Sequence, residues 1–183
     1  MTSIRKILIS TSLVLAVGAG AAIANPMVGG SAMYATKNII QNAIKSKDHT
    51  TLVAAVKAAG LVDTLQGKGP FTVLAPTNEA FAALPAGTVE TLLKPENKAT
   101  LVKILTCHVI PGKAMSGAIA KMAKADGGVH EVKTVGGCVL KLSAKNGKVT
   151  ITDEKGGVAT VTIADVKQSN GVIHVINAVL LPK

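Results

Sequence analysis

Residues 172–181 read VIHVINAVLL, a run in which apolar side chains occupy odd and even positions alike. A strand that is apolar on both faces has to be covered on both, so we predict a central, buried strand here. Residues 71–75, FTVLA, are a second apolar run, bounded by the turn formers Gly69-Pro70 and Pro76. They predict a second, shorter strand. The fold is therefore expected to be organised around a covered sheet.

Helical patterns dominate the sequence around and after the 71–75 strand. Apolar residues recur with helical spacing in five segments: 38–45, 50–59, 88–93, 96–106 and, more weakly, 117–124. Gly60 is placed as a C-terminal stop for the second of them. Thr77 is placed as the N-cap of another helix, with Glu79 in its first turn, where a negative charge suits the helix dipole.

The last third of the chain is rich in strand patterns. Segments 139–142 and 149–152 flank Asn146-Gly147, which predicts a β-hairpin with a type I′ turn. Residues 158–163 alternate apolar residues with threonine, as a half-buried strand does. Because helices come first and strands later, the pattern favours one α+β domain over alternating βαβ units.

The first 24 residues are typical of a secretory signal peptide. Arg5 and Lys6 precede an almost uncharged apolar run, which ends in the small-x-small sequence Ala22-Ile23-Ala24. We therefore divide the chain into a signal peptide (1–24), an N-terminal extension (25–37) and one domain (38–183). A retained transmembrane anchor is the alternative. The mature chain is expected to be secreted, periplasmic or associated with the cell surface, without stable membrane insertion.

The charge of the chain is strongly positive, with a formal net charge of +10 that becomes +8 once Arg5 and Lys6 are removed. The remaining residues hold no arginine, and their aromatic residues are Tyr34, Phe71 and Phe81. The chain therefore has almost no residues that could form bidentate hydrogen bonds to guanine or stack on bases. This argues against nucleic acid as a partner. The lysines predict a solvated surface that favours anionic glycans, lipid headgroups or acidic proteins.

The two cysteines are Cys107 and Cys138. Since an exported protein meets an oxidising compartment, a disulfide between them is the leading assignment. Buried free thiols or a metal pair are the alternatives, and the second lacks any CxxC or Cys/His cluster.

Motifs of catalysis are missing from the sequence. None of the serines after residue 24 lies in GxSxG or SxxK, and no Walker loop, GxGxxG or HExxH is present. Asp153-Glu154, the one adjacent pair of acids, lies in an apparent turn and is interpreted as solvated. We therefore expect no enzymatic activity and no cofactor, with an undetected hydrolase as a remote alternative.

The four histidines, His49, His108, His130 and His174, lack the spacing of metal ligands, so no metal site is predicted. His174 lies inside the apolar run and is expected to be a buried imidazole bonded to backbone groups. His108 follows a helical segment and opens an apolar strand, so it is expected to tie those elements together. A functional role for His108 is the alternative.

Three ordered segments resemble the FAS1 (fasciclin, beta-Ig-H3) family. They are FTVLAPTNEAF at 71–81, HVIPG at 108–112, and NGVIHVIN at 170–177 followed by LLP at 180–182. The resemblance runs from about residue 38 to residue 182. It implies a FAS1 fold, a wedge or sandwich of about seven strands joined to a helical subdomain, with the first and last signature strands at the centre.

The resemblance also implies which residues bind. Family members act in adhesion and in matrix or host association, and animal members use an Asp-Ile pair that matches Asp165-Val166 here. His108 matches the histidine of a central Tyr-His segment, and Cys107 stands where many members have the tyrosine, which weakens the transfer of a tyrosine-dependent contact. His108, Asp165 and Val166 are therefore the candidate binding residues. A turn role for Asp165 is the alternative.

The function we expect is non-catalytic adhesion or surface interaction, in cell–cell, cell–matrix or host association. The partner would be a surface or matrix protein or an anionic glycan. The alternative is a periplasmic carrier of an apolar or anionic small ligand, which would require an enclosed pocket of several hundred cubic ångströms.

Overall fold

The computed structural model describes residues 25–183, so the predicted signal peptide lies outside the described residues. Seven strands form one sheet, in which β3 and β9 run parallel and every other neighbouring pair is antiparallel. In spatial order the strands are β4 (Val109–Pro111), β3 (Phe71–Pro76), β9 (Gly171–Ile176), β8 (Val158–Gln168), β7 (Lys148–Thr152), β6 (Val139–Lys145) and β5 (Val129–Lys133). The seven-stranded sheet with helices confirms the predicted α+β class.

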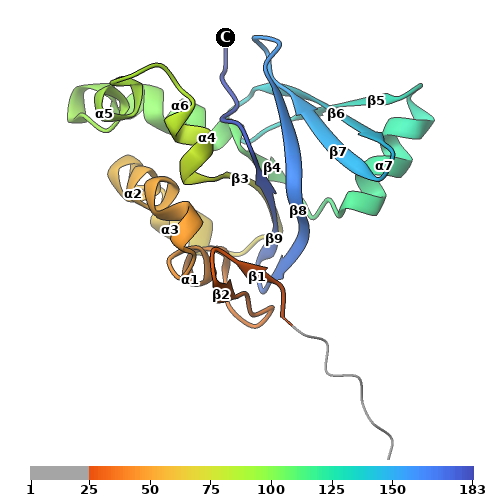
Figure 1. Cartoon of the computed structure of the whole chain (residues 1–183), viewed down its shortest axis with the longest axis horizontal. Coiled ribbons are helices and arrows are strands. Elements are labelled where there is room, and N and C mark those ends of the chain that lie inside the picture. Colours follow the sequence, from red (N-terminus) through yellow and green to blue (C-terminus); the bar gives the residue numbers. More distant parts are fainter. Residues whose placement is uncertain (1–24) are drawn as a thin grey trace, which may run out of the picture.

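Helices cover the sheet on two sides. The α-helices of the described residues are α1 (Ile39–Ala43), α2 (Thr50–Ala59), α3 (Val62–Gln66), α4 (Asn78–Ala82), α5 (Thr88–Leu92), α6 (Lys98–Cys107) and α7 (Ser116–Ala125). Short 3-10 turns precede α2 and α6, at Lys47–His49 and Pro95–Asn97. In Figure 1, α1 to α6 lie together on one side of β3 and β9, whereas α7 lies on the other side, against β5, β6 and β7.

The central strands separate two hydrophobic cores. Val73 and Ile173 face the first core, between the sheet and α1 to α6. Leu74 and Ile176 face the second core, which α7 closes through Ile119. Because successive side chains of a strand point to opposite faces, β3 and β9 carry apolar residues on both faces. The double-sided apolar pattern in the sequence follows from this placement, and all six residues of β9 are buried.

The parallel pairing of β3 with β9 starts at Phe71 and Gly171. A Cβ atom on Gly171 would lie 2.0 Å from the Phe71 carbonyl oxygen, and one on Gly69 would lie 1.9 Å from the Asn170 carbonyl oxygen. Only glycine allows the two chains to approach this closely. The strand β9 ends at Ile176, earlier than the apolar run predicts, although Leu180 stays buried in the second core.

The hairpin of β6 and β7 has the predicted turn. Lys145 pairs with Lys148, and the two residues between them, Asn146 and Gly147, have φ of 52° and 76°. Positive φ at both positions is the signature of a type I′ turn, which confirms the prediction.

The N-terminal segment belongs to the packed structure. Residues 25–37 contain a small hairpin of β1 (Met27–Val28) and β2 (Ser31–Ala32). Val28 and Met33 are buried in the first core. The segment predicted as an extension therefore contributes to the core. The helix α3, the strand β5 and this hairpin are elements that the sequence patterns did not indicate.

A disulfide joins Cys107, at the end of α6, to Cys138, which directly precedes β6, with 5.4 Å between the Cα atoms. The neighbouring backbone reinforces this link, because the Gly136 amide donates to the Thr106 carbonyl at 3.0 Å. The pairing is the one favoured from the sequence.

Candidate functional site

His108 is buried between α6 and the C-terminal segment, with 2% of its surface exposed. Its Nδ1 donates to the Ile104 carbonyl at 2.8 Å, and its Nε2 accepts from the Leu180 amide at 2.9 Å. Burial lowers the pKa of His108 to about 4, against the opposing effects of the Ile104 carbonyl and Asp153. Both ring nitrogens are thus engaged by backbone groups, and the side chain ties two elements together.

His174 has the same character. Its Nε2 donates to the Ala114 carbonyl at 2.8 Å, and its Nδ1 accepts from the Asp165 amide at 3.2 Å. Burial lowers its pKa, although the Ala114 carbonyl and Asp165 oppose the shift. The prediction of a buried imidazole bonded to backbone groups is confirmed.

Asp165 holds the start of α7. One carboxylate oxygen accepts from the Ser116 amide at 2.7 Å, and the other accepts from the Ser116 hydroxyl. Serine, aspartate and histidine therefore meet here, but His174 donates to a carbonyl and not to the serine. A catalytic triad needs the histidine to act as base toward the serine hydroxyl, so this arrangement is structural.

Val166 lies in the first core and has 0% of its surface exposed. A buried Val166 cannot contact a partner, as its candidate role beside Asp165 would require. The reason is an irregularity in β8: Asp165 has a φ of 60°, and the register with β9 shifts between Ile163 and Val166. Such a bulge re-aims the following side chain, here toward the interior. His108 and Val166 are therefore buried in the core, and Asp165 is half-buried with its carboxylate bonded to Ser116.

Asp153 differs from its predicted solvated state, because only 7% of its surface is exposed. Its Oδ1 accepts from the Lys155 and Gly157 amides at 3.0 and 2.7 Å, and its Oδ2 accepts from the Leu181 amide at 2.8 Å. The residue joins the turn between β7 and β8 to the C-terminal segment. Its neighbour Glu154 is half-buried, and hydrogen bonds from the Lys183 and Val139 amides lower its pKa.

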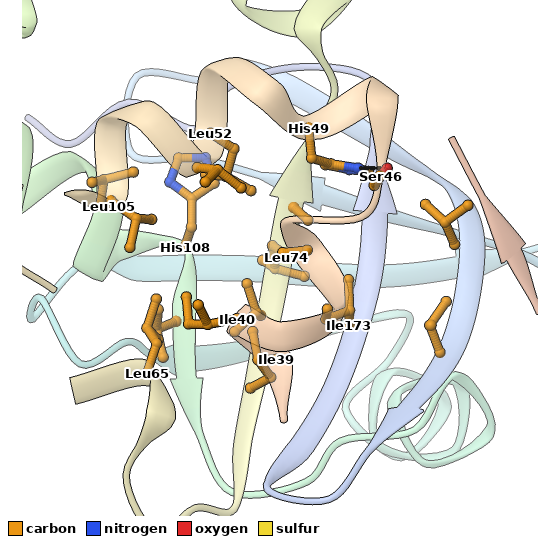
Figure 2. A pocket seen from close by; sticks show the side chains of 18 of the residues that line it. Ile39, Ile40, Ser46, His49, Leu52, Leu65, Leu74, Leu105, His108 and Ile173 are labelled. Carbon is orange, nitrogen blue, oxygen red and sulfur yellow. Dashed lines mark hydrogen bonds between the residues drawn. The ribbon is translucent and has the colours of Figure 1, made fainter. Parts of the chain in front are cut away.

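An apolar cavity of about 50 Å³ lies in the first core between α1, α2 and the sheet. Figure 2 shows the His49 and His108 rings among aliphatic side chains, with His49 bonded to Ser46. The distance from the Ser46 Oγ to the His49 Nδ1 is 2.8 Å. The His49 Nε2 makes no hydrogen bond within the described structure. Burial lowers the pKa of His49, whereas the Ala75 carbonyl acts to raise the pKa of the ring.

A polar cleft of about 510 Å³ opens at the N-terminal ends of β3 and β9. It is lined by residues 66–70 and 168–171 together with Lys113. We call it the cationic cleft, because its charged residues are Lys68 and Lys113. No sequence pattern indicates this cleft, because its three segments lie far apart in the chain and carry no motif.

Groups of three or more His, Cys, Asp or Glu side chains that could hold a metal ion are not found among residues 25–183. Within the same range, no helix is long and apolar enough to cross a membrane.

Comparison with known proteins identifies relatives over most of the chain. The fasciclin domain model matches residues 47–182. Protein sll1483 of Synechocystis sp. is 51% identical over 156 residues, which cover 85% of this chain and 79% of that protein. The immunogenic protein MPB70 of Mycobacterium bovis is 32% identical over 73% of this chain and 63% of its own length.

Animal proteins and a solved structure show the same likeness. The transforming growth factor-beta-induced protein ig-h3 of Sus scrofa is 43% identical over 72% of this chain, which corresponds to 17% of that protein. A FAS1 domain pair from the insect cell adhesion molecule fasciclin I superposes with a TM-score of 0.71 at 17% identity, over 79% of this chain and 51% of that one. The match to the family model and the identity to these relatives show that this chain belongs to the fasciclin (FAS1) domain family.

Proposed function

We propose that the protein is an exported, non-catalytic FAS1 domain that mediates adhesion or surface interaction through its exposed surface. The observation that carries the proposal is the state of the family's signature residues. His108, Asp165, Val166 and His174 are bonded or packed inside the fold, which leaves exposed side chains as the groups free to meet a partner.

The charged side chains of residues 25–183 are mostly cationic. Residues 25–183 carry 18 lysines and ten acids, a net charge of +8 obtained by removing Arg5 and Lys6 from the total of +10. Within the described structure, Lys141 lies 3.7 Å from the Glu131 carboxylate and Lys103 donates to the terminal oxygen of Lys183 at 2.9 Å, whereas the other lysines lie within ion-pair distance of no acidic side chain. A surface of unpaired cations favours an anionic partner through long-range attraction. A surface or matrix protein or an anionic glycan fits this description.

The interior argues against a carrier of an apolar ligand. The apolar cavity measures about 50 Å³. A cavity of about 150 Å³ is what accommodates benzene in a protein core. A carrier of an apolar ligand would have to open the first core, so we do not propose that role.

A bead assay tests the proposal. Beads coated with residues 25–183 are expected to stay on the surface or extracellular matrix of the producing cells, and to be released as rising salt screens the lysines. Beads coated with an unrelated protein of the same net charge are the control. Equal retention of both kinds of bead, or unchanged adhesion by cells that lack the gene, would contradict the proposal.

A further inference from the structure

We propose that the cationic cleft is a binding site for an anionic sugar residue, either a uronate or a sulfated sugar, of a surface or matrix polysaccharide. The inference rests on the proposed function for the source of the sugar, and names the partner class and the place where it binds.

The frame of the cleft is held rigidly. The Asn170 side chain donates to the Leu65 and Gly67 carbonyls at 2.8 and 3.1 Å, and it accepts from the Ile39 amide at 3.0 Å. The Gln168 side chain is buried and bonded to Asn42 and to the Val166 carbonyl. The Asn170 side chain thus joins the two loops of the cleft before any ligand binds. A site ordered in advance loses less conformational entropy on binding.

Close backbone approach completes this frame. The Phe71 amide donates to the Asn170 carbonyl at 3.1 Å, and the Gly112 amide donates to the Pro70 carbonyl at 2.9 Å. The second bond brings the loop after β4, which carries Lys113, against the loop before β3, which carries Lys68. Two lysines far apart in sequence are thereby held at the rim of one cavity.

The charge of the cleft has one sign. Its lining contains Lys68 and Lys113 and no acidic residue. Both side chains are exposed, and within residues 25–183 neither forms an ion pair. An anion bound there would meet two ammonium groups without having to displace a carboxylate. Hydrogen bonds that involve a charged partner are about twice as strong as neutral ones.

The uncharged groups of the cleft suit a sugar. The side chains of Gln66 and Ser169 are exposed and make no hydrogen bond within the described part of the chain. An amide and a hydroxyl can each donate and accept, which matches the hydroxyl groups of a saccharide. The volume of about 510 Å³ lies in the range of small-molecule sites. Pro70 and three glycines are the lining residues without a polar side chain, so hydrogen-bonding groups surround the opening.

The test is a titration of residues 25–183, with the disulfide intact, monitored by amide NMR shifts and calorimetry. The probes are an oligogalacturonate, a sulfated galactose oligomer, a neutral galactose oligomer and inorganic sulfate. We expect the two anionic oligomers to bind and to shift amides in 66–69 and 168–171, and the other two probes to bind at least about tenfold more weakly.

Two double variants separate the site from general charge. Lys68→Gln/Lys113→Gln should weaken oligomer binding by about tenfold or more. Lys121→Gln/Lys124→Gln removes the same charge from the exposed face of α7 and should change the affinity for the oligomers by less than about twofold. Thermal unfolding of both variants checks that they fold.

The inference is overturned by equal loss in the two variants, by equal binding of the neutral oligomer, or by inorganic sulfate that binds as tightly as the oligomers. Binding to phosphatidylglycerol vesicles in place of the oligomers would also overturn it, because the site would then recognise a membrane. Its failure can be told apart from that of the proposed function. Beads that adhere without oligomer binding reject the sugar site alone, and oligomer binding without bead adhesion rejects the adhesive function.

Discussion

The strands β3 and β9 and the cationic cleft at their N-terminal ends are neighbours in sequence but differ in almost every property. The strands are apolar, buried and bonded, and their histidine is held neutral by its surroundings. The cleft begins one residue before β3 and is polar, open and positively charged. The segments by which the family is recognised therefore build the frame, whereas the exposed side chains at its edge are the ones that our proposal assigns to binding.

The largest effect is expected from the buried side of this comparison. His108→Ala leaves the Ile104 carbonyl and the Leu180 amide without partners and creates a cavity. We expect the free energy of unfolding to fall by about 4 kcal/mol. Denaturant unfolding measures it, with His130→Ala on the half-exposed strand β5 as the matched control. A loss below about 1 kcal/mol would show that His108 is not a structural tie.

Removal of the disulfide should cause the second-largest loss of stability. The Cys107–Cys138 link spans 31 residues of sequence. Loop entropy assigns such a link about 3 to 4 kcal/mol, so Cys107→Ser/Cys138→Ser should lower the free energy of unfolding by that amount. Mass spectrometry of the exported protein without reductant checks the link itself. Two freely alkylated thiols in that sample would refute it.

The next largest effect is expected from low pH, which should decrease the free energy of unfolding. The pKa of His108 is about 4 in the fold against an ordinary 6.5. The unfolded chain therefore takes up the proton at higher pH than the fold does, and stability is lost as pH falls from 6.5 toward 4. His108 alone contributes about 3 kcal/mol to this loss, with the lowered pKa values of His49 and His174 acting in the same direction.

Urea unfolding at a series of pH values measures the acid effect. The slope between pH 6.5 and 4 should become shallower in His108→Gln, because the titrating group is gone. A free energy of unfolding that stays constant over this range would contradict the buried, neutral state of His108.

A small effect is expected at the cap that follows β3. The Thr77 Oγ1 accepts from the Ala80 amide at 3.3 Å at the start of α4, as predicted. Thr77→Ala should cost about 1 kcal/mol of stability in thermal or denaturant unfolding. Thr100→Ala, at an exposed position within α6, removes the same hydroxyl without a cap and should cost almost nothing. Equal losses would show that the cap is not the cause.

Local patterns explain why much of the fold was predictable. The Asn146-Gly147 turn, the Thr77 cap and the helix α2 depend on neighbouring residues, and each forms as expected. The double-sided apolar runs indicated the central strands, since the two cores on either side require them.

The features that the sequence did not reveal depend on contacts between distant segments. Asp153 is buried because the Leu181 amide comes to its carboxylate, and Val166 is buried because of the irregularity at Asp165. The strand β5 is an edge strand with weak apolar alternation, and its pairing with β6 decides its state. The cationic cleft forms from three segments that meet only when β3, β4 and β9 pair. No local sequence pattern indicates any of these four features.

The most direct test of the account compares one exposed and one buried change in the same binding assay. Binding to immobilised oligogalacturonate, normalised to folded protein, is measured for Lys68→Gln/Lys113→Gln and for Val166→Ala, each alongside thermal unfolding. We predict that the lysine variant loses binding while its melting temperature is unchanged, and that the valine variant melts lower while its folded molecules bind like the wild type. Normal binding by the lysine variant together with lost binding by the folded valine variant would contradict the account.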